Sequence, residues 1–287
     1  MNAIRVMLVC ALIGLAALPG IAARAQDATP EPFPRRLADH SGALVVIPER
    51  PQQVAVVSQV PPLLALLAPR EIASLEPDTP ADSPHWEAIG LLVIPEASAA
   101  LHAGLVARAR AAEIPIFQTG PIASLPDWRE ALTTLGSATG RDDRAAAMLA
   151  RLDENLDAVR RLVSGREVAR VLVLTPEGYT FGQNTLLTDL IALAGGVNVA
   201  AQAGFDDYRQ IDDTAILELA PDVILLTSTW SADEAADFAA SRAYASVPAS
   251  IRGRIVKLPF SPTLVRDPAA AVAALALVLH PAVLLFP

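Results

Sequence analysis

Short apolar runs alternate with longer amphipathic stretches along most of the chain. In the first half, this pattern predicts strands at 44–47, 54–57, 91–94 and 114–117, with helices at 63–68, at 97–112 and after Pro126. In the second half, it predicts strands at 171–174, 223–226 and 255–258, with helices at 186–194, 216–219, 232–242 and 268–279. Such alternation is typical of βαβ units, whose strands are parallel. The predicted fold class is therefore α/β, with two Rossmann-like lobes that contain mainly parallel sheets.

The stretch between the two halves has one uninterrupted helical period. Between 141 and 163, apolar residues recur every three or four positions, at Ala145, Met148, Leu149, Leu152, Leu156, Val159 and Leu162. Asp142 and Asp143 lie in the first turn, where the helix dipole favours acids. At 1.5 Å per residue, this helix would measure about 35 Å, enough to join two lobes as a rigid strut.

The start of the chain has the pattern of an export signal. Arg5 precedes an apolar run at 6–17, and a small-x-small cleavage pattern ends at Ala25. The run is shorter than the roughly 20 apolar residues that a membrane span needs, which argues against an uncleaved anchor. We expect a periplasmic protein that begins at Gln26, with a flexible proline-rich leader at 26–34.

Composition narrows the classes of partner. The one cysteine, Cys10, lies in the predicted signal, so the exported chain can form no disulfide or thiolate metal site. Without Arg5 and Arg24 the 22 basic residues fall to 20 against 31 acidic ones, for a net charge of −11. Such a surface repels phosphate backbones and anionic lipids, so nucleic acid and anionic membranes are not expected as partners.

The sequence contains no motif of the common enzyme classes. Nucleophile-elbow, zinc-protease, phosphate-loop and dinucleotide fingerprints are all absent. The four histidines, His40, His85, His102 and His280, are far apart in the sequence, so a four-ligand metal site is not expected. We therefore expect a binding protein without catalytic residues, resident cofactor or metal.

Five segments, in this order and spacing, carry a resemblance to a known family. They read PQQVAVVS at 51–58, GSATGR at 136–141, TLLTDLIALAGGVNVA at 185–200, PDVILL at 221–226 and GRIVKL at 253–258. Together they resemble the periplasmic substrate-binding proteins of ABC importers for ferric siderophores, haem and cobalamin. The resemblance implies two lobes joined by one long helix that restrains hinge bending, a ligand held between them, and delivery to an inner-membrane permease.

The expected organisation is a signal peptide at 1–25, an N-terminal lobe at 26–136, a linking helix at 137–165 and a C-terminal lobe at 166–287. The leading hypothesis is a monomer that captures a ferric siderophore or a similar iron chelate. Cobalamin or haem is the alternative ligand. A periplasmic sensor or scaffold of the same fold also stays open, as does, less favoured, a hydrolase.

In the family that the chain resembles, an acidic residue at the start of the first helix of each lobe pairs with permease arginines. The aligned positions here are Pro62 and Thr214. Asp212 and Asp213 stand beside the second of these positions, so they are the acids that could dock to a permease. The first lobe has no acidic residue as close to its aligned position, Pro62.

Ligands of open α/β sheets bind outside the carboxyl ends of the strands, which is where we seek the site. The first lobe contributes Ser58 and Gln59, which follow a strand, and Trp86 in a polar loop. The second lobe contributes Tyr179, Gln183, Asn184, Trp230 and Arg266.

Each of these residues also has a structural interpretation. Trp230 could stack on a flat ligand or pack at the rim. The amides of Gln183 and Asn184 could bind ligand oxygens or form a turn. Arg266 could offset a ligand's negative charge or pair with Asp267. Tyr208 is a weaker candidate for an iron or haem ligand.

Overall fold

Two parallel four-stranded sheets organise the described part of the chain. The computed structural model describes residues 32–57, 62–75, 84–258, 260–261 and 266–281, all within one compact unit. The first sheet has the order β4-β3-β5-β6 and consists of β3 (Gln53–Val57), β4 (Ile72–Leu75), β5 (Ile89–Pro95) and β6 (Ile116–Thr119). The second has the order β12-β11-β7-β9 and consists of β7 (Ala169–Leu174), β9 (Gly196–Asn198), β11 (Val223–Leu226) and β12 (Ile255–Lys257). The predicted parallel α/β architecture is confirmed.

Two antiparallel ribbons accompany the sheets. One pairs β1 (Arg35–Ala38) with β2 (Leu44–Ile47), and the other pairs β8 (Tyr179–Phe181) with β10 (Tyr208–Gln210). Neither β1 nor the second ribbon was predicted, because three- and four-residue strands leave little periodic signal, and the side chains of β10 are all exposed.

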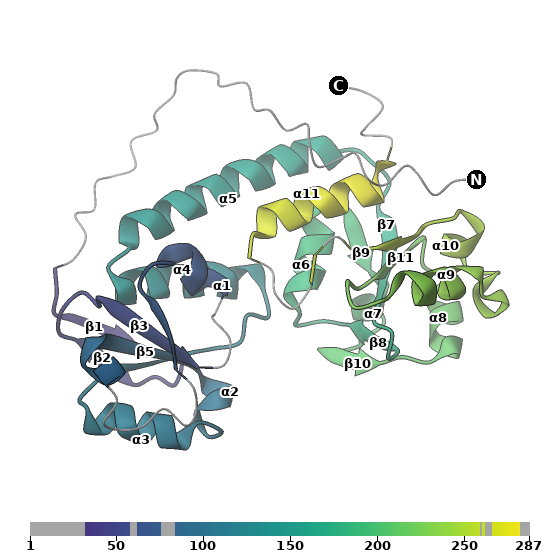
Figure 1. The fold of residues 1–287 in the computed structure, drawn as a ribbon. Helices are drawn as coiled ribbons and strands as arrows, with labels where there is room; N and C mark the ends of the chain where they lie inside the picture. The colour runs from purple at the N-terminus through teal and green to yellow at the C-terminus, as the bar shows by residue number, and fades with distance from the viewer. Residues whose placement is uncertain (1–31, 58–61, 76–83, 259, 262–265, 282–287) are drawn as a thin grey trace. The chain divides into compact units, whose positions relative to one another are not determined.

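Helices cover the faces of both sheets (Figure 1). Around the first sheet lie α1 (Pro62–Leu67), α2 (Glu96–Ala99), α3 (Ala103–Ala111), α4 (Leu125–Thr139) and the short 3-10 helix η1 (Pro84–Ala88). Around the second lie α6 (Leu186–Leu193), α7 (Val199–Gln202), α8 (Asp213–Leu219), α9 (Ala232–Ala240), η2 (Arg242–Tyr244), α10 (Pro248–Ile251) and α11 (Pro268–Leu279). None of these described helices combines the length and apolarity needed to cross a bilayer.

The long helix α5 (Asp142–Val163) is unbroken over its 22 residues, so the predicted strut is confirmed. It packs against α4 and α11 (Figure 1). Its buried side chains Leu152 and Leu156 belong to one apolar cluster that also contains Val56 of the first sheet and Val173 of the second. Separate clusters fill the other face of each sheet. Leu162, expected on the apolar stripe, is 40% exposed, whereas Val159 three residues earlier is buried.

A tight hairpin joins α4 to α5. Gly140 has a left-handed backbone (φ +66°) that ends α4, and the Cβ that a side chain would add at Gly136 would lie 2.6 Å from the Cβ of Ala145. The close contact of the two helices therefore requires glycine at that crossing point.

Arg35 of β1 anchors the start of α5. Its guanidinium lies 2.7 Å from the Asp142 carboxylate, and the Ser137 hydroxyl donates to the same group at 2.8 Å. Burial by itself would raise the pKa of Asp142, but the hydrogen bonds from Arg35 and Ser137 outweigh it and hold that pKa below its ordinary value. The pair thus stabilises the charged carboxylate at the helix N-terminus.

Three sequence predictions need correction. The helix predicted at 97–112 is divided into α2 and α3 by residues 100–102, and α3 begins with Gly104 in its first turn, where the poor helix propensity of glycine weakens the start. The short helix predicted after Pro126 is α4, which begins one residue earlier because Ser124 caps it and proline is tolerated in a first turn. Residues 179–181, predicted as loop, form strand β8.

We expect Gly182→Ala to destabilise the protein by at least about 1 kcal/mol, because the new Cβ would lie 2.0 Å from the Phe205 carbonyl oxygen. Gly104→Ala is the matched control: its Cβ would meet no atom within 4 Å, and alanine favours the helix. Urea denaturation measures both variants. Equal midpoints for the two would contradict the close packing at Gly182.

Candidate functional site

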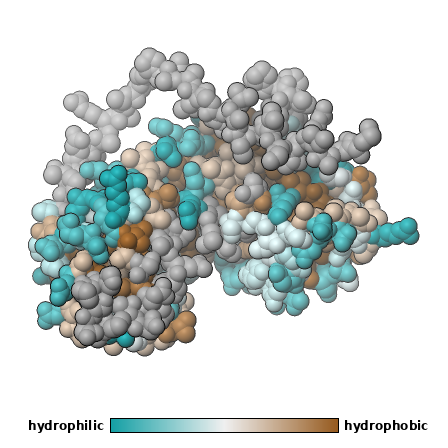
Figure 2. Space-filling view, viewed as in Figure 1, coloured by the Kyte–Doolittle hydropathy of each residue, from teal (hydrophilic) through white to brown (hydrophobic). Residues whose placement is uncertain are grey.

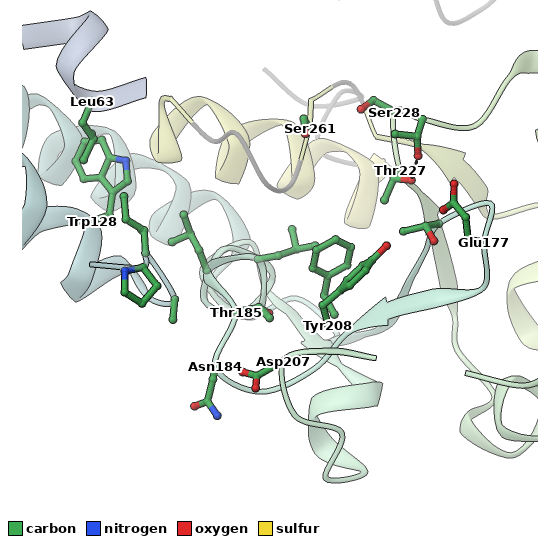
Figure 3. A pocket seen from close by; sticks show the side chains of 18 residues that line it. Leu63, Trp128, Glu177, Asn184, Thr185, Asp207, Tyr208, Thr227, Ser228 and Ser261 are labelled. Atoms are coloured by element: carbon green, nitrogen blue, oxygen red, sulfur yellow. Dashed lines mark hydrogen bonds between the residues drawn. The ribbon is translucent and has the colours of Figure 1, made fainter. Parts of the chain in front are cut away.

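Side chains from both lobes line a cavity of about 880 Å³ (Figure 3). The residues from the first lobe are Leu63, Pro121, Ile122, Ala123 and Trp128. Those from the second lobe are Thr175, Glu177, Phe181, Asn184, Thr185, Leu186, Leu187, Asp207, Tyr208, Thr227, Ser228, Thr229 and Ser261. A volume of this size suits a large organic ligand.

The cavity lies at the carboxyl ends of the parallel strands. Thr175 directly follows β7, and residues 227–229 directly follow β11. On the first-lobe side, residues 121–123 follow β6. The strand-end location expected for a ligand site in an open α/β sheet is therefore the location of this cavity.

Aromatic rings form one wall. The rings of Tyr208 and Tyr179 stack with their centroids 4.7 Å apart and an interplanar angle of 9°, and Phe181 lies tilted at 5.1 Å from Tyr208. Tyr208 and Phe181 line the cavity, and Tyr208 is half exposed. The β8–β10 pairing therefore holds an aromatic surface against the ligand space, with Tyr179 supporting it from behind.

The backbone beside this wall has two left-handed residues. Asn184 has φ +54° and Asp207 has φ +51°, and both line the cavity. Hydrogen bonds fix the two segments together: the Gly182 N–H donates to the Asp207 carbonyl at 2.7 Å, and the Asp207 N–H donates to the Gln183 carbonyl at 2.9 Å. Uncommon backbone geometry of this kind persists where the surroundings hold it, and it is frequent at ligand sites.

The hydroxyl groups lie on the second-lobe side of the cavity. Thr227 and Thr229 share a hydrogen bond of 2.7 Å, and the Thr185 hydroxyl donates to the Gly182 carbonyl at 2.8 Å. The apolar side chains of Leu63 and Trp128 lie on the opposite side (Figure 3), and Ile122 of the first lobe also lines the cavity. The cavity is therefore amphipathic: the first-lobe side is apolar, and the second lobe adds hydroxyls beside the apolar side chains of Phe181, Leu186 and Leu187.

Acidic groups are the charged groups of the lining. Glu177 and Asp207 contribute carboxylates, and no lysine, arginine or histidine is among the described lining residues. Within the described ranges, no three His, Cys, Asp or Glu side chains gather as a metal-binding group. An anionic ligand would thus approach two carboxylates without a compensating cation from this set.

The first turn of α4 connects the two lobes beside the cavity. The Asp189 carboxylate of α6 accepts a hydrogen bond from the Leu125 backbone N–H at 2.8 Å. Leu125 is the first residue of α4, so the acid lies at the positive end of that helix. The contact ties a wall helix of one lobe to a wall helix of the other.

Comparison with known proteins agrees with this architecture. The sequence profile of a family described as "Periplasmic binding protein" matches residues 99–262, which is more than half of the chain. The chain belongs to the periplasmic binding protein family. The family and fold are those of substrate-binding proteins that act in the periplasm.

The comparisons also include individual relatives. A cobalamin-binding protein of Halobacterium salinarum is 33% identical over 123 residues, which cover 42% of this chain and a third of the relative's length. The haem-binding protein RhuT of Roseiflexus sp. RS-1 superimposes with a TM-score of 0.64 at 20% identity, over 81% of this chain and 99% of RhuT. The molybdate-binding MolA of Haemophilus influenzae gives a TM-score of 0.67 at 16% identity, over 88% of this chain and 93% of MolA. The last two show a shared fold.

The structure brings some of the sequence-predicted site residues together. Asn184 lines the cavity, and Tyr179 lies one ring behind it in the aromatic stack. The Gln183 side chain donates to the Ala201 carbonyl at 2.9 Å, while its backbone supports the loop. Tyr208, rated weaker from the sequence, is part of the lining.

Other predicted residues lie elsewhere. Trp230 is 8% exposed, and its indole N–H donates to the Leu174 carbonyl at 2.9 Å, so it has the packing position and lies outside the lining. Trp86 is buried in the cluster on the far face of the first sheet. Arg266 is exposed and borders a separate small crevice. Ser58 and Gln59 fall outside the described residues.

Sequence reasoning missed several lining residues. Residues 227–229 directly follow the strand predicted at 223–226. The expectation that ligands bind at the carboxyl ends of strands could therefore have selected these residues instead of Trp230. The same holds for residues 121–123. Trp128 had no comparable signal, because it lies on a helix whose length and orientation were unknown.

The acids beside the expected docking position have local partners. Asp212 caps α8 by accepting from the Ala215 N–H at 2.8 Å. Asp213 accepts from the Tyr244 hydroxyl at 2.6 Å, and burial together with this carboxylate raises the pKa of Tyr244 to about 12. Both carboxylates remain exposed at the start of the helix.

We expect Asp189→Ala to lower the free energy of unfolding by about 0.5–2 kcal/mol, since it removes the acceptor for a first-turn N–H of α4. Asp189→Asn keeps an acceptor oxygen and should lose less. Asp153→Ala is the control, because it breaks the half-exposed ion pair with Arg129 and should cost at most about 1 kcal/mol. Urea denaturation compares the three, and an Asp189→Ala loss no larger than that of the control would refute the role of this contact.

Proposed function

We propose that this protein captures an uncharged or cationic metal chelate of the corrinoid type in the cavity between its lobes and delivers it to an ABC importer. The observation that carries the proposal is the amphipathic lining, with hydroxyls and aromatic rings, two carboxylates and no basic side chain among its described residues. The similarity to the cobalamin-binding protein of Halobacterium salinarum supports the same ligand class.

The chemistry of a corrinoid complements such a lining. A corrin ring has broad apolar faces, which suit the wall of Leu63, Ile122 and Trp128 and the ring of Tyr208. Its edge carries neutral amides, which can exchange hydrogen bonds with the hydroxyls of residues 227–229 and with the carboxylates. No buried counter-charge is needed for such a ligand.

Ferric siderophores, the leading hypothesis from the sequence, remain the second candidate, and the lining favours uncharged hydroxamate chelates among them. Anionic catecholate chelates fit less well, because Glu177 and Asp207 would repel them. Haem could use the Tyr208 phenol as an iron ligand, but its two propionates would meet the same carboxylates. We therefore place haem third.

Export and delivery complete the proposal. The signal peptide that we propose at 1–25 lies outside the described residues, and it would account for the location in the periplasm that the family implies. Asp212 and Asp213, exposed at the start of α8, are the acids that could meet a permease. We propose a monomer that docks through this end of the second lobe.

We expect cyanocobalamin to bind the protein purified from the periplasm and to raise its unfolding free energy by about 2.7 kcal/mol at 100 times the dissociation constant. An uncharged ferric trihydroxamate should bind more weakly, and haemin and an anionic ferric tricatecholate least. Calorimetric titration and thermal denaturation with each ligand measure this order. Preference for the tricatecholate would overturn the charge argument, and no binding by any ligand would favour the sensor or scaffold alternative.

Charge variants sharpen this test. Glu177→Gln combined with Asp207→Asn should strengthen binding of the anionic chelate and leave cyanocobalamin affinity within about threefold, because the uncharged ligand loses no ion pair. Glu154→Gln combined with Glu167→Gln is the matched control, because it also removes two negative charges and both residues lie outside the cavity lining.

We expect the exported protein to begin at Gln26, and N-terminal sequencing or intact mass of the periplasmic fraction measures this. Replacing two apolar residues of the 6–17 run with arginine should leave the protein in the cytoplasm. A mature chain that keeps Met1 would contradict the cleavage.

A further inference from the structure

The turn of the β1–β2 ribbon holds the end of strand β6. The ribbon lies beside the first sheet (Figure 1), and β6 is an edge strand of that sheet. The Gln118 N–H donates to the Asp39 carboxylate at 3.1 Å, and the Gln118 carbonyl accepts from the His40 N–H at 3.0 Å. Both backbone groups of one β6 residue are therefore bonded to a turn that is distant in the sequence.

The Asp39 carboxylate is buried, and both of its oxygens accept hydrogen bonds. The residue is 7% exposed. One oxygen accepts from the Ser41 hydroxyl at 2.6 Å and from the Ala43 N–H at 3.1 Å, while the other accepts from Gln118. A buried carboxylate is tolerated when such donors replace its water. One oxygen of Asp39 thus builds the turn, and the other fixes β6.

The ring of His40 lies against the residue that follows β6. A Cβ added at Gly120 would lie 2.3 Å from the His40 Nδ1, although the φ of Gly120 is not left-handed. Glycine is therefore suited to this position because it leaves room for the ring. The His40 Nε2 also lies 3.3 Å from a Glu96 carboxylate oxygen, which holds the ring in place.

These contacts hold the loop that forms most of the first-lobe wall. Residues 121–123 are three of the five first-lobe residues in the described cavity lining. The far end of the loop is fixed as well, since the Ala123 N–H donates to the Asp127 carboxylate at 3.1 Å. Pro121 and Ile122 lie between the two fastenings and are exposed. Their position in the wall therefore depends on both ends of the loop.

The ribbon can position the loop because its other end is anchored. Arg35 of β1 is 5% exposed and donates to the Ser137 carbonyl at 2.6 Å. The same guanidinium pairs with Asp142 at the start of α5. The ribbon thus connects the long helix to the cavity wall.

We propose that Asp39 and His40 are positioning residues for ligand binding, because their turn fixes residues 119–123 and so keeps the first-lobe wall in place before a chelate arrives. The inference rests on the proposed function, since it requires the ligand to occupy the cavity. It adds that a turn outside the described lining sets the affinity. A wall that is already ordered lowers the free-energy cost of binding.

The first test is Asp39→Ala, which removes the acceptor for Gln118. Calorimetric titration with cyanocobalamin should show affinity about three- to tenfold weaker than for the wild type, because the loop must then be ordered on binding. Ser41→Ala is the matched control, since it removes a hydrogen bond of the same turn and leaves the Gln118 bond in place. Its affinity should stay within about twofold of the wild type.

A double-mutant cycle tests the His40 contact without removing a buried group. Gly120→Ala should weaken cyanocobalamin binding about threefold or more, because the new Cβ displaces the His40 ring or the loop. In the His40→Ala background the ring is absent, so the same change at Gly120 should weaken binding less. Equal effects in the two backgrounds would overturn the role of His40.

Amide hydrogen exchange in the unliganded protein separates positioning from general stability. Asp39→Ala should speed exchange of the Ala123 N–H, although that amide donates to Asp127 and not to Asp39. Ser41→Ala should leave it unchanged. The Thr227 N–H, which is hydrogen-bonded in the second lobe, is the internal reference and should exchange at the wild-type rate in both variants.

The outcomes distinguish the two proposals. If wild-type protein binds none of the chelates, the proposed function is wrong and this inference falls with it. If wild-type protein binds cyanocobalamin while Asp39→Ala matches Ser41→Ala in affinity or in Ala123 exchange, the ligand site stands and the positioning role of Asp39 is wrong. Should Asp39→Ala fail to fold, the cycle between His40 and Gly120 decides whether the turn positions the loop.

Discussion

One continuous apolar core joins the two lobes, and the cavity depends on it. Leu152 and Leu156 of α5 share a cluster with Val56 of the first sheet and Val173 of the second. Each such aliphatic side chain contributes about 1.5–3 kcal/mol when it is fully buried. A wide separation of the lobes would expose this cluster to water, so the geometry of the ligand space follows from the packing of the strut.

That packing also explains how the cavity can hold unfavourable local features. Two non-glycine residues in its wall, Asn184 and Asp207, have left-handed backbones, and the buried indole N–H of Trp128 has no acceptor among the described residues. Each feature costs free energy in the unliganded protein. They persist because the surrounding helices and the β8–β10 ribbon hold them, which leaves the wall preorganised for a ligand.

The sequence was informative wherever burial repeats along a single element. The strands at 171–174 and 223–226 are continuous apolar runs, and the strut has a clear three-to-four residue period, so all three were predicted within a few positions. The general place of the site followed too, because strand direction determines which sheet edge holds the loops. The type, position and direction of these elements depend on residues that are close together in the sequence.

The composition of the site depends instead on contacts between distant residues. Trp230 follows a strand as expected, but its indole turns into the core to reach the Leu174 carbonyl, a choice that no local pattern records. Tyr208 and Tyr179 are 29 positions apart and stack only because two three-residue strands pair. Trp128 enters the wall through the placement of a whole helix. The periodicity of the sequence indicates which face of one element is buried. It does not indicate which side chains of distant elements come into contact at the site.

The distribution of charge has a kinetic consequence. The chain carries a formal net charge of −9, and the described cavity wall adds carboxylates without cations, so the electric field at the entrance repels anions at long range. The rate at which an uncharged ligand encounters the protein does not depend on that field. Its capture rate would therefore stay nearly constant as the ionic strength around the cell rises and falls, whereas the encounter rate of an anionic competitor would climb with added salt.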